Sequence, residues 1–98
     1  MQIQKEKQNE AVTLKLDGRL DTVTAPGLEA AVNQLEDDVR HLVLDMGGVQ
    51  YISSAGLRVL LGAQKKMNRT GSMKLIGVCE SVMEILEMTG FSDILVIE

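Results

Sequence analysis

The stretch from Asp45 to Leu61 constrains the fold more than any other part of the chain. An apolar run, His41–Leu44, leads into it and has the character of a short buried strand. Gly47-Gly48 is then expected to break regular structure. The period changes beyond Ser54, where apolar residues recur at helical spacing: Leu57, Leu60 and Leu61. This change predicts a strand, a loop and a helix, with Ser54 near the helix N-cap, at the edge where open α/β sheets place their working sites.

Strand and helix patterns alternate along the rest of the chain. Strands are expected at about Ile3–Lys5, Ala11–Asp17, Arg40–Asp45, Met73–Val78 and Ile94–Ile97, the third of them buried on both faces or nearly so. Helices are expected from Thr22–Pro26 to Glu36, over Ser54–Asn68, and from a capping box at Ser81–Glu84 to Gly90. Strands joined through helices pair in parallel, whereas the first two strands form an antiparallel hairpin.

The prediction is one α/β domain over residues 1–98. It has a mixed sheet of four or five strands and about three helices, in the order β-β-α-β-α-β-α-β. Its buried helix positions are Leu28, Val32, Leu35, Leu57, Leu60, Leu61, Ile85 and Leu86. The methionines fill the core for the most part, while Met46 and Met88 fit either the core or a contact surface.

Composition excludes several classes of function. The chain has 14 acidic and 10 basic residues, a net charge of −4 and two aromatic residues, Tyr51 and Phe91, which argues against direct nucleic-acid binding. No apolar run is long enough to span a bilayer, and the N-terminus lacks a secretory apolar region. The single cysteine, Cys79, is expected to be a buried structural residue and cannot form an internal disulfide. These features favour a cytoplasmic protein.

Catalytic and metal-binding motifs are missing or incomplete. Ser54 lacks the glycine of a nucleophile elbow, because Ile52 stands two residues before it. The sole histidine, His41, begins the third strand and lies about 15 Å or more from Ser54, at ~3.3 Å per strand residue. The sequence holds neither a P-loop nor a set of zinc ligands. No catalytic residue, metal or cofactor is therefore predicted.

Three carboxylates fall at or just after strand ends: Asp17, Asp21 and Asp45. If the second and third strands run parallel, Asp21 and Asp45 could reach the same edge of the sheet as Ser53 and Ser54. A carboxylate pair there could bind Mg²⁺ or perform acid–base chemistry. Loop capping and solvation explain the same residues and are the favoured interpretation.

The central stretch resembles the signature of the STAS domain, in particular that of bacterial anti-sigma factor antagonists. The matching residues are Asp45 and the run Tyr51-Ile52-Ser53-Ser54-Ala55-Gly56-Leu57. Gly18-Arg19-Leu20-Asp21 is similar to the family's Gly-x-Leu-Asp after the second strand, and Met88-Thr89-Gly90-Phe91 to its close of the last helix. The resemblance extends over essentially the whole chain.

The resemblance implies a binding module that is not an enzyme. Such proteins bind an anti-sigma factor serine kinase and so release a sigma factor. The kinase phosphorylates the serine that matches Ser54, and a PP2C-type phosphatase removes the phosphate. The family often has Asp where this chain has Ser53, which makes Ser53 the second choice of acceptor. The implied partner-binding residues are Asp21, Tyr51, Ser53, Ser54, Ala55, Gly56, Leu57 and Arg58.

Two other functions stay open. One is a STAS interaction subunit without a phosphoswitch, as in transporter-associated proteins. The other is a small-ligand or nucleotide-binding module that uses the loop amides. In all cases the chain is expected to be a monomer or a weak dimer.

Overall fold

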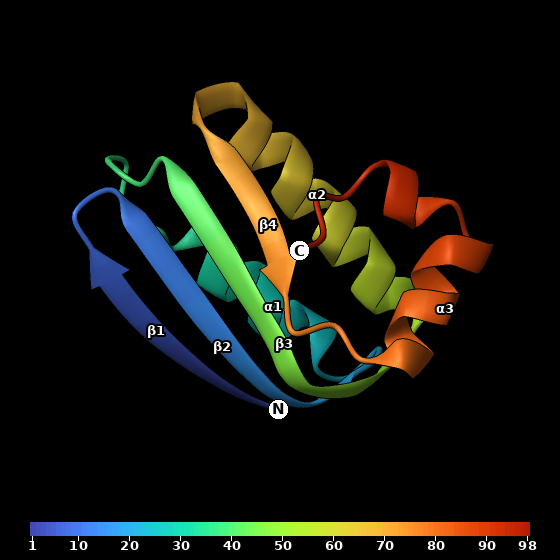
Figure 1. The fold of residues 1–98 in the computed structure, drawn as a ribbon. Coiled ribbons are helices and arrows are strands. Elements are labelled where there is room, and N and C mark those ends of the chain that lie inside the picture. Colours follow the sequence, from blue (N-terminus) through green and yellow to red (C-terminus); the bar gives the residue numbers. More distant parts are fainter.

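The computed structural model describes all residues from 1 to 98 (Figure 1). Its strands are β1 (Gln2–Gln8), β2 (Ala11–Leu20), β3 (His41–Ile52) and β4 (Ser72–Ile76). Its helices are α1 (Ala25–Asn33), α2 (Ser54–Thr70) and α3 (Glu80–Met88), followed by a short 3₁₀ helix, η1 (Phe91–Asp93). The predicted α/β fold with a mixed sheet and three helices is confirmed.

The strands lie in the sheet in their sequence order, β1-β2-β3-β4. β1 and β2 form an antiparallel hairpin around Asn9, which adopts a left-handed φ of 57°. β3 pairs in parallel with both β2 and β4, because α1 and α2 carry the chain back to the start of the sheet. Both helices therefore begin at the edge where β2 and β3 end.

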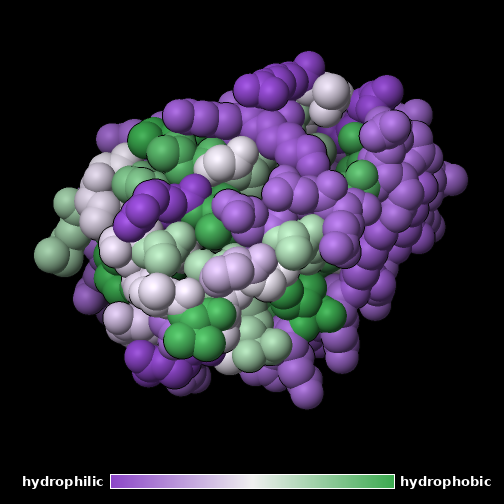
Figure 2. Space-filling view, turned by 180° about the vertical axis from the view of Figure 1, so that it is seen from behind, coloured by the Kyte–Doolittle hydropathy of each residue, from purple (hydrophilic) through white to green (hydrophobic).

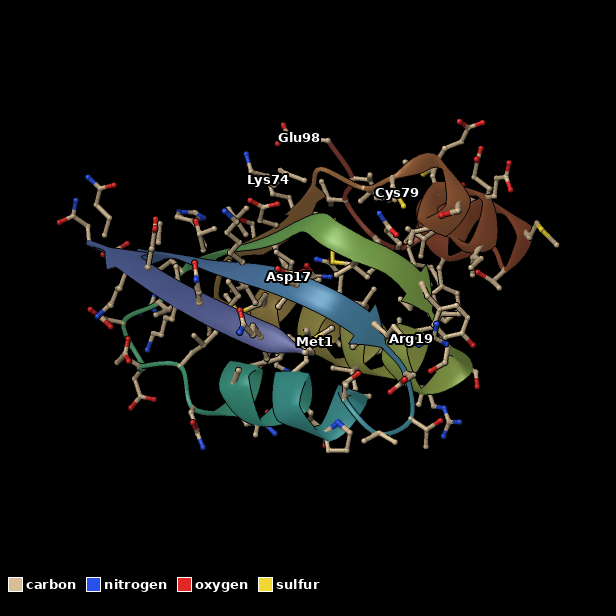
Figure 3. The ribbon with its side chains drawn as sticks, turned by 90° about the horizontal axis from the view of Figure 1, so that it is seen from below. Met1, Asp17, Arg19, Lys74, Cys79 and Glu98 are labelled. Atoms are coloured by element: carbon tan, nitrogen blue, oxygen red, sulfur yellow. The ribbon has the colours of Figure 1, made fainter.

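The core lies between the sheet and the helices α1 and α2, which cover the same face (Figure 3). Alternate residues of β2 point into it and are buried: Val12, Leu14 and Leu16. β3 contributes Leu42, Leu44 and Met46 in the same way. The prediction that β3 is buried on both faces, or nearly so, holds fully only for the face toward the helices, since Val43 and Asp45 are half-buried on the face that α1 and α2 leave open. Met46 is thus a core residue, whereas Met88 is 86% exposed.

The helical stripes pack as predicted, with small differences. Five of the eight expected positions are buried: Leu28, Val32, Leu57, Leu60 and Leu86. The other three are half-buried: Leu35, Leu61 and Ile85. Leu35 and Ile85 pack against the core, and Leu35 lies just beyond α1, which ends at Asn33 and not at Glu36 as predicted. The structure contains no helix long and apolar enough to cross a membrane.

The double glycine does not break β3, which contradicts the sequence prediction. The strand continues through Gly47-Gly48 to Ile52, and the register with β2 shifts between Lys15 and Asp17. A Cβ atom on Gly48 would lie 2.8 Å from the carbonyl oxygen of Leu16. The glycines therefore let the two backbones come close at an irregularity within the strand pair.

The predicted last strand and the predicted capping box are also wrong. Only Ile97 bridges β4, opposite Leu75, because η1 and the helical Ile94 use up the preceding residues. The helix α3 begins at Glu80 after Cys79, so Ser81 lies inside its first turn and donates to the carbonyl oxygen of Gln50 instead. Gly90 does close this region in the left-handed conformation, with φ 79°.

Candidate functional site

Five residues at the ends of β2 and β3 form what we call the serine corner: Arg19, Asp21, Tyr51, Ser53 and Ser54. The two strands are joined there, because the Ser53 N–H donates to the carbonyl oxygen of Leu20 at 2.9 Å. α1 and α2 start on either side of this bond. The corner thus gathers Asp21, Ser53 and Ser54, as the sequence predicts for this edge, but not Asp45.

The two serines have different structural roles. Ser53 is the N-cap of α2: its backbone is extended and its hydroxyl accepts a hydrogen bond from the Gly56 N–H at 3.3 Å. Ser54 is the first helical residue, is exposed, and has a side chain without a hydrogen-bond partner in the protein. The cap therefore lies one residue earlier than predicted. Serine and aspartate both cap helices well, so Ser53 can replace the family's Asp structurally.

The residues after Ser54 support the corner from the side of the core. A Cβ atom on Gly56 would lie 2.7 Å from Leu20 Cγ and 3.0 Å from Ile52 Cγ1. Gly56 and Leu57 are buried, and Ala55 is half-buried. The first turn of α2 can rest on the strand ends only because position 56 has no side chain. Of the predicted binding residues after Ser54, Arg58 is the exposed one.

Asp21 organises the loop between β2 and α1. Its carboxylate accepts hydrogen bonds from the N–H groups of Val23 at 3.0 Å and Thr24 at 3.1 Å. The bond from the Thr24 N–H is the main reason why the pKa of Asp21 lies below its ordinary value. The Thr24 hydroxyl in turn donates to the carbonyl oxygen of Arg19 at 2.6 Å. This network fixes the loop beside Ser54 and leaves Val23 86% exposed.

Arg19 and Tyr51 form a stacked pair that sequence reasoning did not find. The guanidinium carbon of Arg19 lies 4.2 Å from the centre of the Tyr51 ring. Arg19 projects from the end of β2 (Figure 3) and its side chain is 66% exposed, while Tyr51 is 39% exposed. The irregular register between Gly18 and Leu20 brings the two side chains together. A regular strand pairing inferred from sequence would not have aligned them.

The remaining candidates lie elsewhere. His41 stands at the opposite end of β3 from Ser54 and its ring Nδ1 lies 2.8 Å from Ser72 Oγ. Asp45 sits in mid-strand, where its carboxylate accepts from the Gly47 N–H at 3.0 Å. Asp17 faces Gly48 in the neighbouring strand and does not reach the corner. No group of three His, Cys, Asp or Glu side chains is arranged to hold a metal ion.

Two large exposed apolar side chains, Tyr51 and Val23, lie at or beside the corner, and the others lie on α3 and the C-terminal segment. Figure 2 shows hydrophobic atoms toward α3 and the end where α2 begins, and a hydrophilic surface on the side of β1. The large exposed apolar residues are Val23, Tyr51, Met88, Ile94 and Val96. The corner therefore combines a free hydroxyl, a stacked arginine and exposed apolar groups, a composition suited to protein binding.

Comparison with known proteins agrees with this architecture. An anti-sigma-B factor antagonist of Listeria monocytogenes is 32% identical over 97 residues, which cover 96% of this chain and 84% of the relative. An anti-sigma factor antagonist from Mycobacterium paratuberculosis superimposes with a TM-score of 0.87 at 23% identity, covering 98% of this chain and 83% of that one. Phosphorylated SpoIIAA of Bacillus gives a TM-score of 0.76 at 17% identity, covering 99% and 91%.

The two solved structures establish the likeness of the folds. The family assignment comes from the sequence profile described as the STAS domain, which matches residues 2–98, almost the entire chain. The profile match includes every strand and helix of the fold and all of the serine corner. This chain belongs to the STAS domain family.

Proposed function

We propose that this protein is an anti-sigma factor antagonist controlled by phosphorylation of Ser54. The unmodified chain binds an anti-sigma factor serine kinase in the cytoplasm, and the sigma factor is released. The kinase phosphorylates Ser54 and the complex separates, after which a PP2C-type phosphatase regenerates the binding form. The observation that carries this proposal is the exposed, unpaired hydroxyl of Ser54 at the first position of α2. The curated relatives' names support the antagonist role.

Ser54 is a better acceptor than Ser53 for a physical reason. The Ser53 hydroxyl already accepts the Gly56 N–H and is half-buried, so modification there would disturb the helix cap. A phosphate on Ser54 would lie near the unpaired N–H groups of the first turn of α2, where negative charge is favoured. The fold can therefore carry the phosphate, in keeping with a neighbour of the same fold that has been solved in a phosphorylated form.

The same phosphate would oppose a docked partner. It adds about −1.5 to −2 units of charge at the centre of the serine corner. A coupling of about 1–3 kcal/mol between phosphorylation and binding changes the affinity about 5–150-fold. In this scheme Tyr51, Ser54 and Arg58 contact the partner, since they are exposed. The other implied residues hold the surface in shape: Asp21, Ser53, Ala55, Gly56 and Leu57.

The test begins with capture of partners by the full chain from lysate of its native host, with identification by mass spectrometry. We expect an ATP-dependent serine kinase, which then phosphorylates the purified chain on Ser54 but not the Ser54→Ala variant. Calorimetry on the authentic phosphoprotein, before and after phosphatase treatment, should give weaker binding in the phosphorylated state. Equal affinities in the two states would overturn the switch. Specific capture of a transporter in place of a kinase would overturn the antagonist role.

A further inference from the structure

We propose that Arg19, held against Tyr51, is a specificity-determining contact that receives a carboxylate group of the anti-sigma kinase. This inference rests on the proposed function and adds a residue and a partner chemistry to it. The relevant feature is an arginine that is fixed in place by its neighbours and yet retains its hydrogen-bonding groups for a partner.

The guanidinium of Arg19 donates no hydrogen bond within the protein. Its nearest anion is the carboxylate of Asp21, and the distance from Nε to Oδ2 is 3.6 Å, longer than a hydrogen bond. That carboxylate already accepts the N–H groups of Val23 and Thr24. Arg19 therefore keeps a set of guanidinium donors unpaired, on a side chain that is 66% exposed.

The Tyr51 ring restricts this arginine. An exposed arginine ordinarily loses side-chain entropy when a partner fixes it. Stacking at 4.2 Å from the ring centre removes part of that loss before binding. Arg19 is the only basic residue of the chain that stacks on an aromatic ring. Lys5, Lys7 and Lys74 form closer ion pairs with acidic groups of the chain, whereas the pair of Arg19 with Asp21 is long, at 3.6 Å.

The chemistry of the pair identifies its ligand. A planar guanidinium with free parallel donors binds a carboxylate through two hydrogen bonds, which an ammonium group cannot reproduce. Arginine and tyrosine are also the side chains that most often dominate protein interfaces. Because the chain has a net charge of −4, an acidic partner segment is attracted only where a basic group is available, and Arg19 supplies one at the serine corner.

This contact also connects recognition with the switch. A partner carboxylate drawn to Arg19 would lie on the same corner as Ser54. Phosphorylation would then place two negative groups near each other, and the phosphate would also compete for the arginine. The predicted consequence is that the loss of affinity on phosphorylation is larger in the parent chain than in a chain without Arg19.

The experiment measures binding of the captured kinase to the full chain by calorimetry, for unphosphorylated and phosphorylated forms. Arg19→Ala should weaken binding of the unphosphorylated chain about tenfold or more, the loss typical of an interface hot spot. Arg19→Lys should recover only a small part of this loss, because it restores charge without the planar fork. Tyr51→Leu should weaken binding and Tyr51→Phe much less. Lys15→Ala is the matched control, an exposed basic residue of the same strand, and should bind like the parent.

Circular dichroism and urea unfolding check that all variants are folded. Tyr51 is the only tyrosine in a chain without tryptophan, so its fluorescence reports on the stack in the variants that keep it. The emission of Tyr51 should change in Arg19→Ala and not in Lys15→Ala. Parent-like affinity of Arg19→Ala, with phosphorylation still weakening binding, would overturn this inference and leave the proposed function standing. Weaker binding of Arg19→Ala, together with equal affinities of the phosphorylated and unphosphorylated parent chain, would support the contact and reject the switch. If no kinase binds, both the Arg19 contact and the proposed function are rejected.

Discussion

The Ser53 N–H donates to the carbonyl oxygen of Leu20 at 2.9 Å, which joins the last residue of β2 to the residue that caps α2. This bond extends the parallel pairing of β2 with β3, in which Leu20 lies beside Ile52. The start of α2 is thereby fixed relative to the start of α1. A switch residue at this point has a rigid surface around it, so a modification can change binding without a change of fold.

The first prediction separates the two serines by stability. Ser53→Ala should lower the free energy of unfolding by about 0.5–2 kcal/mol, because the Gly56 N–H loses its acceptor. Ser54→Ala should change it very little, since the Ser54 hydroxyl has no partner. Ser53→Asp should retain the cap. Urea unfolding of the three variants measures these differences. Equal losses in Ser53→Ala and Ser54→Ala would contradict the assignment of the cap.

The second prediction compares a glycine in the middle of α2 with the glycine that ends it. Gly71 ends the helix with an extended φ of 179°, and a Cβ atom there would lie 1.6 Å from the carbonyl oxygen of Arg40. Gly71→Ala should therefore cost about 1–3 kcal/mol or more, because the backbone must move. Gly62 has no atom within 4 Å of its Cβ position, so Gly62→Ala should stabilise the helix by about 0.5–1 kcal/mol. Thermal unfolding measures the change in melting temperature of each variant. Changes of the same sign in the two variants would contradict this account.

The order of the elements could be predicted from sequence because the signals were local. The alternation of Val12, Leu14 and Leu16 indicated a strand, and the spacing of Leu57 and Leu60 indicated a helix. Parallel pairing then followed from the intervening helices. These patterns depend on which side of one element is buried, and sequence periodicity records that directly.

The errors came from interactions between elements. Gly47-Gly48 reads as a break, and only the approach of the β2 backbone explains why the strand continues through it. The final strand is absent because Ile94 is the helical C-cap of η1, so that of the apolar run Ile94–Ile97 only Ile97 forms a bridge, to Leu75. The stack of Arg19 on Tyr51 depends on a register shift that no local pattern records. Contacts between distant segments therefore decided each of these outcomes.

The third prediction concerns the ion pairs that hold the loop after α1 against β1. Lys5 and Lys7 pair with Glu36 and Asp38 there, and hydrogen bonds from the two lysines lower the pKa of these carboxyls. Their stabilising effect should be present above about pH 4 and be lost as the pH falls through the lowered pKa values. The hydrogen bond to Asp38 raises the pKa of Lys7. The stabilisation that Lys7 contributes is therefore present below about pH 10.5, the ordinary pKa of lysine, and is lost as the pH rises through the raised pKa.

Urea unfolding of the double variant Glu36→Gln, Asp38→Asn tests this prediction. The double variant should be less stable than the parent chain at about pH 7 and equally stable at strongly acidic pH. The difference at pH 7 should be smaller in high salt. Asp37→Asn is the control, because no ion pair holds the Asp37 carboxylate. A difference that persists unchanged to strongly acidic pH would show that the two carboxylates act through packing and not through charge.

The last prediction concerns Cys79, which is half-buried and is the N-cap residue of α3. The Ser81 hydroxyl, 3.3 Å from Sγ, is the main reason why the pKa of the thiol lies below its ordinary value, and the Val82 N–H adds to it. The thiolate should therefore form at lower pH than in a free cysteine, for which the pKa is about 8.5.

Alkylation by iodoacetamide, followed by mass spectrometry across a pH series, should show a midpoint that moves upward in Ser81→Ala. Ser72→Ala is the matched serine control and should leave the midpoint in place, because Ser72 pairs with His41 at the start of β4. The parent chain unfolded in urea should show the ordinary midpoint. An identical midpoint in folded and unfolded chains would mean that neither Ser81 nor the start of α3 affects the thiol.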